Sequence, residues 1–314
     1  MKVMSDTLNF WIPEESAVTL GKFDGIHKGH QKLMKKVAEK KEQGLKSVAF
    51  TFGQMPGTVL CGKGRTILTR SERMKHLESL GIDYMVVCPF VPDIIQMEPE
   101  RFIEEILVKQ LHVKYIAVGP DFRYGHNRRG DVKLLKKLAD LYGYEVEVFE
   151  KECLEDKIIS STYVRHMLET GEMETVQKLL GYPYYVSGSV VHGHAIGRKI
   201  GIPTINLIPD DEKMLPPNGV YLTKTVIDRE HYFGITNIGV KPTISGEEAK
   251  GIETHLFDYE GDLYGRELIV EFFAFERAER KFESLVDLQA QLAMDLQWGR
   301  AFIMEKKNAN QKSG

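Results

Sequence analysis

The sequence predicts an α/β protein of two parts: a doubly wound parallel sheet, followed by a six-stranded antiparallel β-barrel with a terminal helix. At 314 residues the chain is long enough for two domains that each bury a core. Up to about residue 150 strand-like apolar runs alternate with helical patterns, whereas short strands follow one another from about residue 184. We therefore expect domains over residues 1–183 and 184–314, joined near Gly181–Tyr184.

The first part alternates strand and helix in a regular order. An apolar strand over 17–20 leads into a helix on which Leu33, Met34 and Val37 recur at helical spacing before Gly44. Further strands are expected over 47–52, 84–90, 114–119 and 145–149, and further helices over 72–80, 99–111 and 131–142. Such alternation is typical of a parallel sheet with right-handed crossovers.

The second part lacks long helical faces until its end. Six strand candidates span residues 184–191, 204–207, 220–226, 231–238, 252–257 and 268–275, with turn signals between them. Six such strands indicate a closed or nearly closed antiparallel barrel. A helix over 283–301 is expected to follow, and the polar tail after Glu305 is expected to fray. Its expected buried face consists of Leu285, Leu288, Leu292, Met294 and Trp298.

Composition limits the classes of function. A net charge of −3 with 28% charged residues indicates a small-molecule ligand rather than nucleic acid or a membrane surface, and no obligate protein partner is evident. No apolar run reaches 18 residues and the first eleven residues lack a basic segment before an apolar run, so we expect a cytoplasmic protein. Cys61, Cys88 and Cys153 are too widely spaced for a disulfide framework or a zinc site, and Cys88 is expected in the core.

The loop after the first strand predicts a site for a nucleotide phosphate. Gly21, Gly25 and Gly29 permit tight turns at the start of a helix, where free N–H groups and the helix dipole favour an anion. His27 and His30 lie three residues apart and are able to donate hydrogen bonds to one phosphate. The alternative is two surface histidines in a glycine-rich turn. The pattern is neither a Walker loop nor Gly-x-Gly-x-x-Gly, but His-x-Gly-His resembles the nucleotidyltransferase superfamily signature.

Two further polar loops follow the fourth and fifth strands, over 119–130 and 159–165. Ligands of such sheets bind at the carboxyl ends of the strands, so all three loops should converge on one edge. Ser160, Ser161 and Thr162 at a helix start would offer hydroxyls and N–H groups to phosphates, and Arg165 would add a forked positive charge. Considered alone, Ser161 is better explained as a plain N-cap.

The second part has one informative loop and one unusual carboxylate. Three glycines at four-residue spacing over 193–201 make a loop that is able to lie against phosphates, although a merely flexible barrel loop has the same pattern. Thr204 and Asn206, on one face of the next strand, are suited to hold hydrated magnesium. Glu253 lies within an otherwise apolar strand, where a carboxylate is costly unless it is paired, exposed or catalytic.

Nearly the whole chain resembles the prokaryotic bifunctional riboflavin kinase/FMN adenylyltransferase family, also called FAD synthetase. In the first part the matching segments are 21–30, 119–125 and 159–165. In the second part they are 197–198 with 203–206, 237–239 with 241–243, Glu253, and Arg277 ahead of 281–282. A histidine loop and a Pro-Thr-x-Asn barrel rarely share a chain otherwise, so the combination is specific.

The resemblance implies two reactions: the barrel phosphorylates riboflavin from ATP, and the first domain transfers AMP from a second ATP to FMN, giving FAD and pyrophosphate. It implies that His27 and His30 stabilise charge on the attacked α-phosphate, and that Glu253 orients or deprotonates the ribityl hydroxyl. The implied ATP and phosphate residues are Gly21, Phe23, Asp24, Gly25, Gly29, Ser160, Ser161, Thr162, Arg165, Gly193, Gly197 and Arg198. The implied flavin residues are Asp121, Phe122, Arg123, Tyr124 and Arg277, and Thr204 and Asn206 are the implied Mg²⁺ ligands.

Three departures from the family pattern are present. Gly53-Gln54-Met55-Pro56 stands where Asp-Pro-His-Pro is usual, Tyr163 where the phosphate motif has arginine, and Ile205 where the kinase motif has alanine. The first two predict a weakened or retuned adenylyltransferase, and the third a tolerated change in packing.

Two rival functions remain at this point: a single-activity enzyme of the same family, and a flavin-responsive regulatory protein without turnover. The intact histidines favour catalysis, and Glu253 with Thr204 and Asn206 favours an active kinase. A flavin sensor should also carry an effector surface such as a basic patch, and we find none in the sequence.

Overall fold

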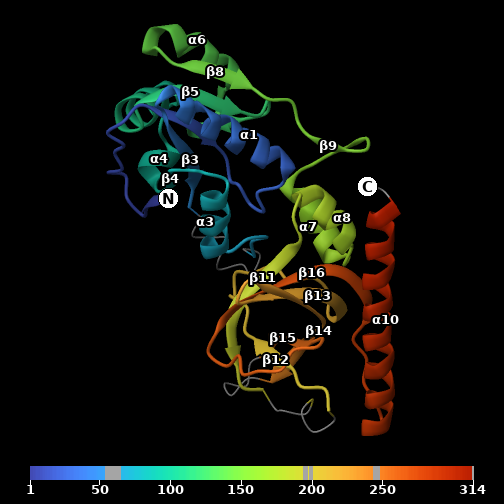
Figure 1. The fold of residues 1–314 in the computed structure, drawn as a ribbon. Coiled ribbons are helices and arrows are strands. Elements are labelled where there is room, and N and C mark those ends of the chain that lie inside the picture. Colours follow the sequence, from blue (N-terminus) through green and yellow to red (C-terminus); the bar gives the residue numbers. More distant parts are fainter. Residues whose placement is uncertain (54–64, 194–196, 198–200, 243–247, 313–314) are drawn as a thin grey trace. The chain divides into compact units, whose positions relative to one another are not determined.

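The computed structural model describes residues 1–314 except 54–64, 194–196, 198–200, 243–247 and 313–314 (Figure 1). Its contacts divide the chain into two compact units, Met1–Ser161 and Thr162–Gly314. The sequence analysis placed the division at 183/184 instead. Residues 162–183 group with the barrel because helix α8 (Met173–Leu180) packs on barrel strands β11 and β16. The preceding helix, α7, spans Ser161–Glu169.

The N-terminal unit is built on a parallel sheet, as predicted, although the sheet has six strands rather than the five expected. Its strand order is β1-β4-β3-β2-β5-β8, and each neighbouring pair is parallel. The order reverses between β2 and β5, which is the switch point of a doubly wound sheet. The strands are β1 (Lys2–Ser5), β2 (Ser16–Leu20), β3 (Lys46–Phe52), β4 (Tyr84–Cys88), β5 (Val113–Val118) and β8 (Glu145–Val148).

The central strands are buried on both faces, which explains their continuous apolar sequence. All five residues of β2 are buried, and Cys88 is fully buried at the end of β4, as predicted. The covering helices are α1 (Lys28–Glu39), α3 (Arg70–Ser79), α4 (Pro92–Ile95), α5 (Pro99–Arg101) and α6 (Val132–Tyr142), with 3₁₀ turns η1 (Lys40–Gln43) and η3 (His126–Arg128). Asp131 caps α6 as predicted, because its side chain accepts a hydrogen bond from Leu134 N.

The structure departs from the sequence-based prediction at one helix and several short strands. The helix expected over 99–111 continues beyond α5 as a π-helix, η2 (Phe102–Gln110), which buries Phe102, Ile103, Ile106 and Leu107. Edge strand β1 was missed because it has only four residues. Two small hairpins were missed as well: β6 (Arg123–Tyr124) with β7 (Gly130–Asp131), and β9 (Cys153–Leu154) with β10 (Lys157–Ile158).

The C-terminal unit contains the predicted closed barrel, with strand order β11-β12-β15-β14-β13-β16. Inside it, the buried hydroxyls of Thr223, Thr236 and Thr254 form a chain with oxygen–oxygen distances of 2.7 Å. The strands are β11 (Tyr184–Val191), β12 (Ile205–Leu207), β13 (Gly219–Ile227), β14 (Glu230–Pro242), β15 (Glu248–Leu256) and β16 (Glu267–Ala278).

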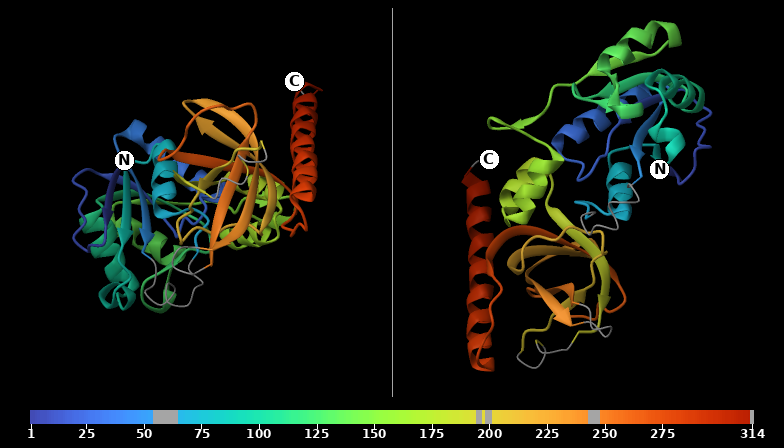
Figure 2. Two further views of the ribbon diagram at one scale, coloured as in Figure 1. Left: turned by 90° about the horizontal axis from the view of Figure 1, so that it is seen from below. Right: turned by 180° about the vertical axis from the view of Figure 1, so that it is seen from behind.

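The terminal helix α10 (Leu285–Lys312) runs along the outside of the barrel (Figures 1 and 2). The predicted buried face was wrong at Leu285 and Met294, which are 63% and 61% exposed. The helix instead buries Gln291, Asp295 and Gly299, four residues apart. This face is partly polar because Asp295 accepts two hydrogen bonds from Arg277 of β16. The tail expected to fray after Glu305 is helical to Lys312.

Candidate functional site

The loop between β2 and α1 has a constrained backbone. Phe23, Gly25 and Ile26 have φ values of 50°, 79° and 37°, a region that favours glycine. At Gly25 a Cβ atom would also lie 3.0 Å from the Ile67 side chain. The Asp24 carboxylate accepts a hydrogen bond from Ile67 N at 2.9 Å, and the Asp24 carbonyl accepts one from Ser161 Oγ at 2.8 Å. These contacts fix the loop at the sheet edge.

Two imidazoles are stacked at the start of α1. His27 is the N-cap residue, and its side chain makes no capping hydrogen bond. The rings of His27 and His30 lie 3.7 Å apart between centroids at an interplanar angle of 19°. Phe23 packs edge-on against His30, with ring centroids 5.3 Å apart. A side chain at Gly29 would come within 3.3 Å of the His27 ring, so glycine leaves this face of the ring free.

Both imidazoles are neutral at pH 7. Burial lowers the pKa of His27 from 6.5 to about 4, and the nearby Asp24 carboxylate only partly offsets this shift. Burial also lowers the pKa of His30 well below its usual value, with further lowering by His27 and by the positive charge of Arg73. The Nδ1 atom of each ring is buried and makes no hydrogen bond within the described parts of the chain. Buried polar atoms usually have a hydrogen-bond partner, so these two nitrogens are candidates for hydrogen bonds to a ligand.

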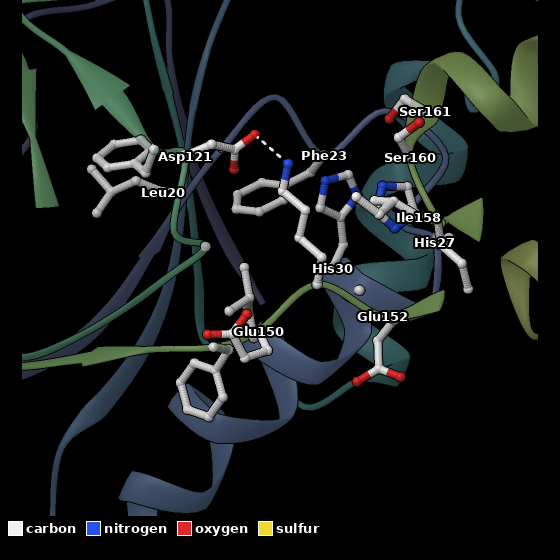
Figure 3. A pocket seen from close by; sticks show the side chains of 18 residues that line it. Leu20, Phe23, His27, His30, Asp121, Glu150, Glu152, Ile158, Ser160 and Ser161 are labelled. Atoms are coloured by element: carbon white, nitrogen blue, oxygen red, sulfur yellow. Dashed lines mark hydrogen bonds and ion pairs between the residues drawn. The ribbon is translucent and has the colours of Figure 1, made fainter. Parts of the chain in front are cut away.

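The histidine pair opens onto a cavity of about 290 Å³ at the carboxyl edge of the sheet (Figure 3). In this view Asp121 and the two serines lie on opposite sides of the histidine pair. The lining comes from the loops after β2, β5 and β8 and from the segment leading into α7. The lining residues are Leu20, Gly21, Phe23, His27, Gly29, His30, Leu33, Gly119, Asp121, Phe122, Phe149, Glu150, Lys151, Glu152, Ile158, Ile159, Ser160 and Ser161.

The expected meeting of three loops at one edge is confirmed for these lining residues. Thr162 and Arg165 belong to the other unit, and the Arg165 guanidinium contacts Met214 Sδ at 3.8 Å. A fourth lining segment, Phe149–Glu152, was missed by the sequence analysis. The available signal was its position directly after β8, because every loop at that edge of the sheet is a candidate.

Two of the predicted flavin residues in this unit line the cavity, namely Asp121 and Phe122. Tyr124 is buried and stacks on Phe122, with ring centroids 5.5 Å apart. Arg123 does not line the cavity and pairs with Asp131 at 2.9 Å. The altered segment at Gln54–Pro56 lies outside the described residues.

In the barrel unit, strand register brings the predicted kinase residues into one row. Asn206 of β12 is paired with Glu253 of β15, and Glu253 is paired with Asn237 of β14. Asn237 in turn is paired with Val220 of β13, which is paired with Arg277 of β16. Directly paired residues share a face, so this row lies on the face opposite Ile252 and Thr254, both fully buried.

Two described glycines of the 193–201 segment pack closely against their neighbours, and Gly193 lies next to Asn206 of this row. A Cβ atom at Gly193 would fall 2.4 Å from the Asn206 side-chain amide, so a larger residue would displace Asn206. At Gly197 a Cβ would meet the Ile202 carbonyl at 2.3 Å and the Thr204 methyl at 3.5 Å. Close approach of the backbone therefore explains both glycines. Arg198 lies outside the described residues.

The guanidinium of Arg277, a predicted flavin residue, is held by a buried carboxylate. Its Nε and Nη2 atoms donate to Asp295 at 2.9 and 2.6 Å. Gln291 donates to the same carboxylate at 2.5 Å. Burial, together with the Asp295 charge, raises the pKa of the neighbouring Glu276 to about 7.

Comparison with known sequences matches both parts of the chain to enzyme families. Residues 10–163 match the FAD synthetase family, and residues 180–303 match the riboflavin kinase family. The first segment covers most of the parallel-sheet unit, and the second covers the barrel strands and most of α10. Residues 164–179, which include most of α7 and α8, lie in neither match.

Relatives from several bacteria align along nearly the full length. The bifunctional riboflavin kinase/FMN adenylyltransferase of Listeria monocytogenes is 34% identical over 95% of both chains. The Escherichia coli protein of that name is 37% identical over 93% of this chain and 94% of its own. The Bacillus subtilis protein of that name is 36% identical over 90% of this chain and 91% of its own.

A solved structure has the same fold. It is a Streptococcus pneumoniae protein described as a macrolide-efflux protein, 30% identical, with a TM-score of 0.85 over 96% of this chain and 99% of that one. Among the described residues of the present chain, no helix is long and apolar enough to cross a membrane. Both parts of the chain match the two enzyme families, and relatives more than 30% identical align over more than 90% of both chains. This chain therefore belongs to the bifunctional riboflavin kinase/FMN adenylyltransferase family.

Proposed function

We propose that the N-terminal unit carries the adenylyltransferase site at the histidine pair and that the barrel unit carries the kinase site at Glu253. The chain acts in FAD biosynthesis: it phosphorylates riboflavin with ATP and transfers AMP from ATP to FMN, releasing pyrophosphate. The observation that best supports the first site is the stacked pair of His27 and His30, whose buried Nδ1 atoms have no hydrogen bond in the described chain. Because both reactions use ATP, we also propose that the protein works in the cytoplasm.

In adenylyl transfer, the neutral imidazoles donate N–H groups to oxygens of the attacked α-phosphate. Their role is to stabilise the charge that develops there, since donors held in place before the reaction need no reorganisation. The FMN phosphate is already ionised and is itself the nucleophile, so the site needs alignment rather than a strong base. The free N–H groups at the start of α1 add to the anion site.

The remaining N-terminal residues bind the substrates. Ser160 and Ser161, which line the cavity, hold the leaving phosphates. Gly21, Phe23, Asp24, Gly25 and Gly29 shape the ATP loop. Asp121 and Phe122 contact the flavin, Tyr124 supports Phe122 by stacking, and Arg123 fixes the same hairpin through Asp131.

In the kinase step, Glu253 orients the ribityl hydroxyl and accepts its proton as the γ-phosphoryl group is transferred. Its register neighbours are the amides Asn206 and Asn237. Thr204 and Asn206 offer hydroxyl and amide oxygens on this face, which fit Mg²⁺. When bound, Mg²⁺ neutralises charge on the ATP phosphates.

Four further residues complete the proposed kinase site. Gly193 and Gly197 let the backbone approach the phosphates closely, and Arg198 binds phosphate through its positive charge. Arg277, fixed by Asp295, contacts the flavin.

Incubation of the full chain with riboflavin, ATP and Mg²⁺ tests both activities together. We expect FMN to appear first and FAD to follow, when the flavins are separated over time. A single-activity enzyme would stop at FMN or convert only supplied FMN. A flavin-responsive regulator would bind flavin without producing either compound.

A further inference from the structure

The segment after β8 contributes one lysine to the lining of the proposed adenylyltransferase cavity. Lys151 Nζ lies 2.7 Å from Asp121 Oδ2, an ion pair that joins the loops following β5 and β8 (Figure 3). Both side chains are partly exposed, 38% for Lys151 and 71% for Asp121. Exposed pairs of this kind contribute little to stability, so a stronger anion is able to displace the carboxylate.

The charges around the cavity make this lysine unusual. Among the described residues that line it, Lys151 is the one lysine or arginine, against the carboxylates of Asp121, Glu150 and Glu152. The two imidazoles carry no charge at pH 7 because burial lowers the pKa of each. ATP and FMN nevertheless bring several negative charges to this cavity, and phosphate oxygens are strong acceptors for a lysine ammonium group.

We propose that Lys151 binds a phosphate group of the adenylyl-transfer substrates, and that Asp121 holds the ammonium group in the cavity until the phosphate replaces it. This inference rests on the proposed adenylyltransferase site. Two sources of phosphate are possible, the ATP chain and the FMN ester, and the kinetic test separates them. The lysine is a binding residue and takes no part in proton transfer.

The test compares Lys151→Met, Lys151→Arg and Lys32→Met in the full chain. Lys32 is the matched control because it forms a similarly exposed pair, 2.6 Å from Glu152, and does not line the cavity. The KM for ATP is measured at saturating FMN, and the KM for FMN at saturating ATP, each at several salt concentrations. Loss of a charged hydrogen bond to phosphate should raise one KM about 10- to 100-fold in Lys151→Met.

The proposal predicts three accompanying results. The substrate whose KM rises identifies the bound phosphate, and the salt dependence of that KM should become shallower because one charge contact is lost. Lys151→Arg should remain within a few-fold of wild type. Lys32→Met should be unchanged, and riboflavin phosphorylation should be unaffected in all three variants.

Two outcomes would overturn the proposal. Both KM values of Lys151→Met could stay within about twofold of wild type, against the 10-fold or larger change expected of a phosphate contact. Alternatively, Lys32→Met could show the same change, which would mean that loosening the segment after β8 is sufficient. A wild-type protein that makes no FAD from FMN and ATP would instead refute the proposed adenylyltransferase site itself.

Discussion

Lowering the pH from 7 to 5 should destabilise the N-terminal unit by about 2 kcal/mol through His27 alone. Burial lowers the folded-state pKa of this residue to about 4, against 6.5 in an unfolded chain. Between these values the unfolded state binds more protons than the folded state, so stability is complete above pH 6.5 and falls as the pH drops toward 4. At pH 5 the difference from 6.5 is 1.5 pKa units, each about 1.4 kcal/mol.

Two measurements check this prediction. Histidine labelled with ¹³C at Cε1 should show one ring, assigned by its loss in His27→Gln, that stays neutral from pH 8 to pH 5. In urea unfolding, His27→Gln should lose less stability than wild type over the same range. Val37→Ala is the control, because it removes buried volume from α1 without removing a titrating group. A His27 midpoint near 6.5, or equal pH slopes in wild type and His27→Gln, would refute the inference that burial keeps the ring neutral.

The same pKa shift predicts the pH profile of adenylyl transfer. Since His30 is also neutral at pH 7, deprotonation of an imidazolium should not reduce kcat/KM between pH 6 and pH 8. If kcat/KM fell as the pH rose, with a midpoint near 6.5, a charged histidine would be required instead.

Two further predictions concern the barrel unit. A fragment of residues 162–314 should have a larger free energy of unfolding than a fragment of 184–314, by several kcal/mol, because α8 buries four apolar side chains on β11 and β16. Urea unfolding measures the difference. Equal midpoints for the two fragments would argue that α8 does not belong to this unit. Asp295→Asn should destabilise the barrel unit by about 3–5 kcal/mol by leaving the Arg277 charge unpaired, and should lower the pKa of Glu276 from about 7. If Asp295→Asn had the same free energy of unfolding as wild type, the Arg277–Asp295 pair would contribute nothing to the stability of the barrel unit.

Much of the fold was predictable because local pattern and tertiary environment agree. Each main strand of the sheet and the barrel was expected to within a few residues, since buried parallel strands and short barrel strands have distinctive apolar patterns. The face of α10 was not predictable. Its buried positions are Gln291, Asp295 and Gly299, and burial there depends on contacts with strands distant in sequence. Asp295, for example, is paired with Arg277 of β16. Apolar periodicity carries no signal for such a polar contact.

The site was predictable to the extent that it follows strand ends. The loops containing His27, Asp121 and Ser160 meet at one cavity, as the topology requires. The neutrality of the histidines was not predictable, because it depends on how deeply the rings are buried. Lys151 was missed because a lysine between two glutamates resembles any solvent-exposed loop.

The most direct test that each unit carries its own site is to inactivate one proposed site at a time, in two separate variants. His30→Ala and Glu253→Gln are each given riboflavin, or FMN, with ATP and Mg²⁺, and the flavins are quantified. Removing one donor or base typically lowers a rate about 100-fold or more. We expect His30→Ala to make FMN at nearly the wild-type rate but almost no FAD. We expect Glu253→Gln to make almost no FMN from riboflavin but to convert supplied FMN to FAD normally, with unchanged melting. Loss of both activities in either variant, or retention of more than about a tenth of kinase turnover in Glu253→Gln, would contradict the assignment, since base removal normally costs far more.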